Sequence, residues 1–337
     1  MEQGSAGSRA WQGLKTALGI GVALPLIGLL LPLWYLHRWH ERRTGRPEPE
    51  PPWREIWPRR KRVVVAPVPG GDPCRVRSRA TTSARSAPLT SVPSVAGVAL
   101  VTGGARRLGA EISRELASLG YRVAVLYLRS SSQAEALVAE IRAGGGEAAA
   151  FSLDQGDPQQ IVRLLDEVEG HWGVPDLLVN NASLFEPTPV EGASWQGLER
   201  LCRVNCLGPM WLAWQAAERM KNRTDGRAPG GQIVQICDIW GERPLAGHGG
   251  YSVSKAGLIM ATRVLAREMA PSVRVNGIAP GAILAREGES GFQTLLSRTP
   301  LARHAGPEAI LVALRYLLNA PFVTGEILHV DGGRSLL

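Results

Sequence analysis

Beyond residue 96, short apolar runs alternate with longer segments whose apolar residues recur at helical spacing. The short runs predict strands at 98–102, 123–127, 148–153, 177–180, 232–236, 273–278 and 327–330. The longer segments predict helices, for example from the three- and four-residue spacing of Ile161, Leu164 and Val168. Apolar strands that alternate with helices indicate a parallel sheet covered on both faces. The pattern therefore predicts a doubly wound α/β fold, in which ligands bind beyond the carboxyl ends of the strands.

The first 95 residues differ in composition from the rest of the 337-residue chain. They hold 12 of the 24 prolines, and their 15 basic and 6 acidic residues give a net charge of +9. Residues 96–337 hold 23 basic and 24 acidic residues, a net charge of −1. We therefore divide the chain into an extension, 1–95, and one domain, 96–337. The near-neutral domain gives no electrostatic sign of a nucleic-acid partner.

Within the extension, residues 16–36 form an uncharged run of about the ~20 residues that a transmembrane helix needs. More arginines follow this run than precede it, which would place the domain in the cytoplasm. Residues 41–95 are rich in Pro and Arg without apolar periodicity, and indicate a disordered linker. Two interpretations stand: a membrane anchor, or an over-long reading frame whose true start lies near Val92.

A glycine-bearing turn, Thr-Gly-Gly-Ala-Arg-Arg-Leu-Gly, joins the first predicted strand to a helix. Glycine lets the backbone approach a pyrophosphate, which then lies at the helix N-terminus. Candidate cofactor-binding residues here are Gly103, Arg106, Arg107, Leu108 and Gly109. Arg107 stands where such turns usually have their middle glycine.

The end of the second predicted strand favours NADP over NAD. Arg129 and Ser130 follow the second strand, with no acidic residue nearby. A carboxylate there would bind the ribose 2′-hydroxyl of NAD, whereas Arg129 and Ser130 suit a 2′-phosphate. A solvated charge at a strand end is the alternative for Arg129. Asp154, after the third strand, would contact adenine, or else cap the helix that begins near Pro158.

Tyr251 and Lys255 are four residues apart and share one face of a predicted helix. A phenol with a pKa near ~10 needs a nearby cation before it can exchange protons at neutral pH. Residues 96–337 contain only two lysines, Lys221 and Lys255, among their 23 basic residues. This scarcity favours a specific use for the compact ammonium of Lys255.

The ordered set of motifs resembles the short-chain dehydrogenase/reductases over residues 96–337. The set comprises TGGARRLG, Asp154, NNAS at 180–183, Asn205, YSVSK and Pro280-Gly281. The resemblance implies a single Rossmann-type catalytic domain that binds NADPH and assembles as a homodimer or homotetramer. It assigns further residues to the cofactor, namely Asn181, Ala182, Ser183, Tyr251, Lys255, Pro280 and Gly281.

The resemblance also implies that Asn205 anchors a water-linked proton path through Lys255. From the residues alone, an asparagine in the middle of an apolar helix, here 198–220, would more commonly be exposed.

Three departures from the family pattern point to a subfamily. Asp238 stands where most of these enzymes have a serine, thirteen residues before the tyrosine, and both Arg107 and Ser183 replace glycines. Together with the segment Phe-Glu-Pro-Thr-Pro, these departures resemble the pteridine and dihydromonapterin reductases. The resemblance implies that Phe185 stacks on a pterin and that Arg107 and Ser183 bind its polar edge or the cofactor phosphates. A place in the hydrophobic core is the alternative for Phe185.

An aspartate at position 238 suits a particular kind of substrate. An ionised carboxylate would repel the alkoxide that forms when a carbonyl is reduced. It suits a C=N bond, whose nitrogen must receive a proton. This preference agrees with the resemblance, which implies NADPH-dependent reduction of a dihydropterin, dihydromonapterin, biopterin-like or folate-like ring. Asp238, Tyr251, Lys255 and Asn205 are the expected catalytic residues, and Arg107, Ser183, Phe185, Asp238 and Tyr251 the expected substrate-binding residues.

Two other functions remain open: a carbonyl reductase of the 3-oxoacyl-carrier-protein type, and a non-catalytic, membrane-tethered NADP-binding protein. The histidines lack metal-ligand spacing, so no metal site is expected. The cysteines are interpreted as inert thiols. Residues 282–300 form an irregular stretch that is interpreted as a lid over the substrate.

Overall fold

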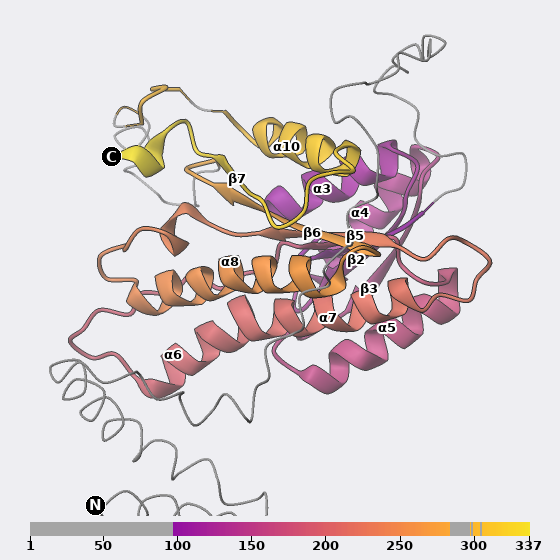
Figure 1. Ribbon diagram of the computed structural model, residues 1–337, viewed down its shortest axis with the longest axis horizontal. Coiled ribbons are helices and arrows are strands. Elements are labelled where there is room, and N and C mark those ends of the chain that lie inside the picture. Colours follow the sequence, from indigo (N-terminus) through magenta and orange to yellow (C-terminus); the bar gives the residue numbers. More distant parts are fainter. Residues whose placement is uncertain (1–96, 284–296, 298, 304) are drawn as a thin grey trace, which may run out of the picture. The chain divides into compact units, whose positions relative to one another are not determined.

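Seven parallel strands form one sheet in the order β3-β2-β1-β4-β5-β6-β7 (Figure 1). The structure is a computed structural model that describes residues 97–283, 297, 299–303 and 305–337. The strands are β1 (Val98–Thr102), β2 (Arg122–Tyr127), β3 (Glu147–Ser152), β4 (Leu177–Asn180), β5 (Gly231–Ile236), β6 (Val273–Pro280) and β7 (Ile327–Val330). All seven predicted strands are confirmed to within two residues at each end, and so is the doubly wound α/β fold.

Helices cover both faces of the sheet (Figure 1). One face carries α3 (Arg107–Ser118), α4 (Ser131–Ala143) and α10 (Glu308–Asn319). The other carries α5 (Pro158–Trp172), α7 (Gly208–Lys221) and α8 (Gly249–Met269). Because both faces are covered, the strands are apolar throughout, and every residue of β1 is buried.

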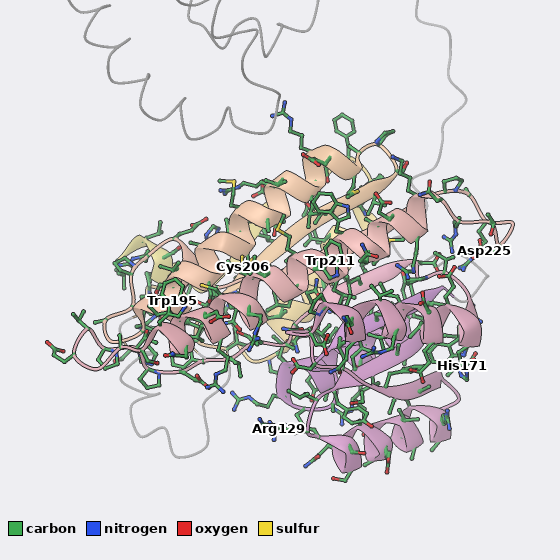
Figure 2. The ribbon with its side chains drawn as sticks, turned by 90° about the horizontal axis from the view of Figure 1, so that it is seen from below. Arg129, His171, Trp195, Cys206, Trp211 and Asp225 are labelled. Carbon is green, nitrogen blue, oxygen red and sulfur yellow. The ribbon has the colours of Figure 1, made fainter. Side chains whose placement is uncertain are left out.

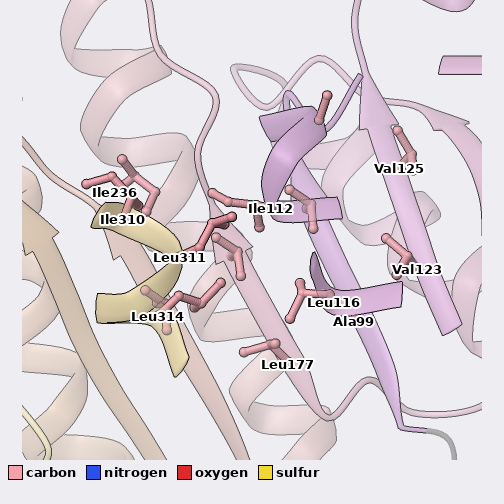
Figure 3. Close-up of a cluster of buried hydrophobic side chains, with 14 of the residues drawn as sticks. Ala99, Ile112, Leu116, Val123, Val125, Leu177, Ile236, Ile310, Leu311 and Leu314 are labelled. Atoms are coloured by element: carbon pink, nitrogen blue, oxygen red, sulfur yellow. The ribbon is translucent and has the colours of Figure 1, made fainter. Parts of the chain in front are cut away.

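Two large apolar clusters hold these layers together. On the first face, Ile112 of α3 and Leu314 of α10 pack against the sheet (Figure 3). On the second, α5, α7 and α8 pack against the opposite sides of the same strands, with Leu165 and Leu212 fully buried. The sheet is therefore clamped between two cores, which leaves only its edges and strand ends open to ligands.

The chain order reverses between β1 and β4. The chain runs outward from β1 through β2 to β3, then returns to pair β4 against the other side of β1. The connections that leave β1 and β4 diverge at their carboxyl ends, and this divergence opens the crevice in which doubly wound folds bind ligands.

The predicted helix over 198–220 is divided in the structure. It consists of α6 (Trp195–Cys202), a π-helical turn (Arg203–Leu207) and α7. A π-helical turn adds a residue to the local helical repeat and changes which side chains face inward. Asn205 lies in this turn and is fully buried, so the expectation of an exposed asparagine from residue patterns alone is wrong.

The helix that begins at Pro158 is capped by Asp157. Its Oδ1 accepts hydrogen bonds from the amides of Gln159 at 2.9 Å and Gln160 at 3.2 Å. Asp154 instead turns back on its own loop, where its Oδ1 accepts from the amide of Gly156 at 2.8 Å. The capping alternative for Asp154 is therefore wrong.

The expected membrane anchor at 16–36 and linker at 41–95 lie outside the described residues, as does most of the expected lid at 282–300. Within the described ranges, none of the helices combines the length and the apolar character needed to span a bilayer.

A pair of substitutions in α10 tests the first core. Leu314 is fully buried, so Leu314→Ala should lower the free energy of unfolding by about 2–5 kcal/mol through lost burial and a residual cavity. Val312 on the same helix is 52% exposed, and Val312→Ala should change that free energy by less than about 0.5 kcal/mol. Urea unfolding followed by circular dichroism measures both values. Equal losses in the two variants would contradict the packing described here.

Candidate functional site

A groove of about 820 Å³ lies at the carboxyl ends of β1 to β4. Its volume falls within the ~300–1,000 Å³ of typical small-molecule sites. Eleven predicted cofactor-binding residues line it: Gly103, Arg106, Arg107, Leu108, Gly109, Arg129, Ser130, Asp154, Asn181, Ala182 and Ser183. The structure thus gathers residues from four separate strand ends into one wall.

The turn after β1 leaves no room for larger side chains. A Cβ atom on Gly109 would lie 2.1 Å from the carbonyl oxygen of Gly103 and 2.7 Å from Nδ2 of Asn181. Gly103 itself has a φ of +60°, in the left-handed region that favours glycine. The backbone of this turn therefore forms a shallow cradle at the start of α3.

Arg107 departs from the usual turn pattern and has a φ of +52°. This value explains why glycine is usual at this position, because a side chain there costs conformational energy. Arg107 nevertheless adopts this conformation, and its exposed side chain lies at the mouth of the groove. Arg107 thus combines an unusual backbone conformation with a place in the lining of the groove.

The first turn of α3 is open to an anion. Arg106 occupies the N-cap position, and its side chain makes no capping hydrogen bond. The first amides of α3 carry the positive end of the helix dipole. A phosphate group placed there would be bound by backbone amides and by the neighbouring guanidinium groups.

The groove carries more positive than negative charge. Its lining includes five arginines, at 106, 107, 129, 200 and 203, and three acids, Asp154, Asp157 and Glu186. Arg200 is paired with Glu186 across the rim. Arg129 is exposed just beyond the end of β2, where it projects from the fold (Figure 2). This charge distribution suits a dinucleotide with an additional phosphate on its ribose.

Two residues that the sequence analysis did not single out, Thr102 and Gln155, form hydrogen bonds that join the segments lining the groove. Thr102 Oγ1 accepts from the amides of Asn181 and Ala182, both at 2.9 Å, and so ties β4 to β1. Gln155 Nε2 donates to the carbonyls of Ala182 at 3.0 Å and Val204 at 2.8 Å. Thr102 could have been suspected from its place before the glycine turn, but no local pattern marks Gln155.

The phenol of Tyr251 is hydrogen-bonded to the carboxylate of Asp238. Tyr251 Oη donates to Asp238 Oδ2 at 2.6 Å, and the amide of Trp240 donates to Asp238 Oδ1 at 2.9 Å. Both carboxylate oxygens of Asp238 thus accept a hydrogen bond. The structure brings together the two groups on which the sequence interpretation depends most.

Lys255 lies beneath this pair. Its Nζ is 5.8 Å from the centre of the Tyr251 ring and donates to the carbonyl of Ile236 at 2.9 Å. The side chain is buried, so loss of solvation lowers the pKa of Lys255, while the charge of Asp238 opposes that shift. The ammonium is thus held next to an aromatic ring and a carboxylate that both stabilise positive charge.

Both polar atoms of the Asn205 side chain form hydrogen bonds with neighbouring residues. Its Oδ1 accepts from the amide of Leu184 at 2.7 Å and from Ser183 Oγ at 3.2 Å. Its Nδ2 donates to the carbonyl of Leu184 at 2.8 Å and to Ser254 Oγ at 3.1 Å. The Ser254 hydroxyl donates in turn to the carbonyl of Tyr251 at 2.7 Å. The π-helical turn thus links the loop after β4 to the helix that carries Tyr251.

Phe185 lies against the catalytic tyrosine candidate rather than in the hydrophobic core. Its ring centre is 4.6 Å from that of Tyr251, edge to face, and 4.4 Å from that of His248. Phe185 is only half-buried. An aromatic face therefore stands beside the phenol, and His248, which the sequence analysis passed over, belongs to the same group of rings.

Four predicted cofactor-binding residues, Tyr251, Lys255, Pro280 and Gly281, are not among those that line the groove. Pro280 ends β6, and the amide of Gly281 donates to the carbonyl of Val330 at 3.0 Å. A Cβ on Gly281 would lie 2.7 Å from the Cα of Asp331, so this glycine permits a close backbone approach.

Burial raises the pKa of the Cys237 thiol, next to Asp238, to about 11, consistent with an inert cysteine.

The glycine cradle leads to a direct test. Gly109→Ala should raise the Kd for NADPH by about tenfold or more, because the new methyl group displaces the turn. Gly170, in an exposed part of α5 with no atom near its Cβ position, provides the control. Gly170→Ala should leave the Kd unchanged. Fluorescence titration with NADPH measures both, and unaltered binding in Gly109→Ala would contradict the assignment of this groove.

Comparisons with known proteins agree with this geometry. The short chain dehydrogenase family model matches residues 97–293. A 3-oxoacyl-[acyl-carrier-protein] reductase of Synechocystis is 33% identical over 243 residues, which cover 71% of this chain and 96% of the relative. The crystal structure of FolM alternative dihydrofolate reductase 1 from Brucella canis, complexed with NADP, has a TM-score of 0.64 at 33% identity and covers 72% of this chain and 95% of its own.

A second FolM structure, from Brucella suis in complex with NADP, has a TM-score of 0.66, also at 33% identity, and covers 72% of this chain and 96% of its own. These matches span the domain described here. The chain belongs to the short-chain dehydrogenase family.

Proposed function

We propose that this protein reduces the ring of a pterin, with NADPH as the reductant. The family and the NADP-bound structures it resembles make it an NADP(H)-dependent oxidoreductase. The observation that carries the finer proposal is the 2.6 Å hydrogen bond from Tyr251 Oη to Asp238 Oδ2. It puts a carboxylate where a serine hydroxyl would serve a carbonyl substrate.

The residues of the groove fit this cofactor. The N-terminal turn of α3 and the cradle of Gly103 and Gly109 suit its pyrophosphate. Arg129 and Ser130 suit the 2′-phosphate, and Asp154 would stand near the adenine. When bound, NADPH supplies the hydride. Pro280 and Gly281, at the end of β6, are proposed to complete the nicotinamide end.

Tyr251, Lys255 and Asp238 would deliver the proton that the substrate nitrogen takes up. Lys255 stabilises negative charge on the phenol of Tyr251, which lets that phenol release its proton near neutral pH. Asp238 accepts the phenol's hydrogen bond and can pass a proton onward to the substrate nitrogen, directly or through water. Asn205 holds the loop of Ser183 and Leu184 in place, and the resemblance to the family implies that it also anchors a water-linked proton path through Lys255.

The charge at Asp238 discriminates between substrate classes. Carbonyl reduction builds negative charge on oxygen, which an ionised aspartate opposes. Reduction of a C=N bond builds electron density on a nitrogen that takes up a proton, and a carboxylate next to a phenol can assist this step. The resemblance to the FolM alternative dihydrofolate reductases supports this interpretation.

Phe185 supplies an aromatic surface for a flat substrate. Its ring stands beside Tyr251, so a heterocycle that stacked on Phe185 would lie within reach of the phenol. Arg107 and Ser183, at the mouth of the groove, are proposed to bind the polar edge of the ring or the cofactor phosphates.

A carbonyl reductase of the 3-oxoacyl-carrier-protein type is the second candidate. Relatives from Synechocystis and Staphylococcus aureus carry that name at 33% and 32% identity. Measuring NADPH oxidation with dihydropterins, dihydrofolate and an acetoacetyl thioester side by side separates the two. Turnover of the thioester without turnover of any pterin would overturn the main proposal.

We also propose that the chain assembles as a homodimer or homotetramer. Trp211 of α7 and Val253 and Met260 of α8 are 39%, 65% and 55% exposed, on two helices that pack side by side (Figure 2). Large apolar side chains exposed on neighbouring helices favour burial against another surface. Anchoring through residues 16–36 remains a separate proposal that depends on the extension alone.

Substitution of the two paired residues tests the mechanism. Asp238→Ser and Tyr251→Phe should each lower pterin-dependent NADPH oxidation by at least about 10²-fold, because each breaks the proton path. Asp166, an exposed aspartate of α5 paired with Arg219, is the matched control. Asp166→Ser should retain full turnover. Unchanged rates in either site variant, measured at saturating NADPH, would refute the roles of these residues.

The pH profile tests Lys255. Burial lowers the pKa of Lys255 below its usual 10.5, so the ammonium is lost at a lower pH than that of an exposed lysine. The kcat for pterin reduction should therefore begin to fall below pH 10.5 as Lys255 loses its charge. Lys221→Met, at an exposed lysine, should leave the profile unchanged. A kcat that stays constant up to pH 10.5, with folding verified by circular dichroism, would contradict this role.

A further inference from the structure

A threonine from a distant loop caps the helix that carries Tyr251. The amide of Gly250 donates to Thr188 Oγ1 at 2.9 Å, across 62 residues of chain. The N-cap residue of α8, His248, makes no capping hydrogen bond with its own side chain. Gly250 is the second residue of α8, and its amide is one of those that a capping side chain normally satisfies. The Thr188 hydroxyl therefore does what the local N-cap residue does not.

The backbone of Thr188 is held to the same segment. Its amide donates to the carbonyl of Gly247 at 2.7 Å, and Thr188 forms an isolated parallel bridge with His248. A Cβ on Gly250 would lie 3.3 Å from the Thr188 methyl carbon, so the two segments are in close contact. The loop after β4 and the first turn of α8 are thus joined by both backbone and side chain.

This junction stands between two proposed functional side chains. Phe185 lies three residues before Thr188 on the same loop, and its ring contacts those of His248 and Tyr251. Tyr251 follows Gly250 directly, and its hydroxyl is bonded to Asp238. The place of the Phe185 ring relative to the Tyr251 phenol therefore depends on how the loop is fixed to α8.

We infer that Thr188 is a positioning residue that sets the separation between the substrate's stacking surface and its proton donor. This inference rests on the proposed function, because it takes Phe185 as the surface on which the substrate ring lies. Neither Thr188 nor Gly250 is among the residues that line the groove proposed for NADPH. Loss of the hydroxyl should consequently impair use of the substrate and leave cofactor binding intact.

Two substitutions separate the hydroxyl from the methyl group. Thr188→Val keeps the shape and removes the acceptor of the Gly250 amide, and it should lower kcat/KM for the pterin about tenfold. Thr188→Ser keeps the acceptor and should stay within about threefold of the unsubstituted protein. In both variants the Kd for NADPH should be unchanged. A loss of NADPH affinity in Thr188→Val would overturn the inference, because it would show general support of the fold.

A double-mutant cycle with Phe185→Leu tests whether Thr188 acts through the aromatic ring. If it does, Thr188→Val should have a smaller effect on kcat/KM in the Phe185→Leu background than in the unsubstituted protein. Equal effects in the two backgrounds would show that Thr188 acts independently of Phe185 and would overturn the inference. A purely structural role would predict equal effects together with a reduced amount of folded protein.

The cycle remains informative if the proposed substrate is wrong. Failure of the unsubstituted protein to reduce any pterin refutes the proposed function directly. The same four proteins are then assayed with whichever substrate of the panel the unsubstituted protein reduces. Non-additive effects on that substrate would support the positioning role of Thr188 alone, whereas additive effects or an unaffected Thr188→Val would reject it.

Discussion

The parallel direction of all seven strands is the constraint on which this site depends. Parallel strands point their carboxyl ends to one edge, so the loops after β1, β2, β3, β4 and β5 meet there although they are far apart in sequence. The two cores hold the sheet rigid from both faces and leave that edge open. A binding groove and a reactive pair consequently occupy neighbouring places on one scaffold.

Hydrogen bonds between the loops at this edge of the sheet fix the positions of the side chains in the site. Thr102 joins β1 to the loop after β4, and Asn205 joins that loop to the inner face of α8. The carboxylate of Asp238 accepts a hydrogen bond from the phenol of Tyr251, and the ammonium of Lys255 lies over the face of the same ring. Since each of these groups is buried or half-buried, an unpaired partner would be costly, and the network holds its members in one arrangement.

Charge then divides the site into two ends. Arginines dominate the groove, where a multiply phosphorylated cofactor would be bound. At the other end, a single carboxylate lies next to a phenol and an aromatic face. A carboxylate is poorly suited to stabilise an alkoxide but well suited to share a proton with a ring nitrogen. This contrast is the basis of the proposal that Asp238, in place of a serine, favours a substrate whose ring nitrogen takes up a proton.

The sequence by itself determined the order of strands and helices, the glycine turn and the Tyr251–Lys255 pair, because these depend on local periodicity and on spacing along one helix. The resemblance to the short-chain dehydrogenase/reductases also singled out Asp238, which stands where most members of that family have a serine. Only the tertiary structure decided that Asn205 is buried and that Thr188 caps α8. Both features depend on contacts between segments distant in the chain. The cap of α5, by contrast, follows a local pattern that our sequence analysis did not use, because Asp157 directly precedes Pro158. No local pattern encodes the contacts of Asn205 and Thr188, because in an isolated segment the polar groups of these side chains would form hydrogen bonds with water instead.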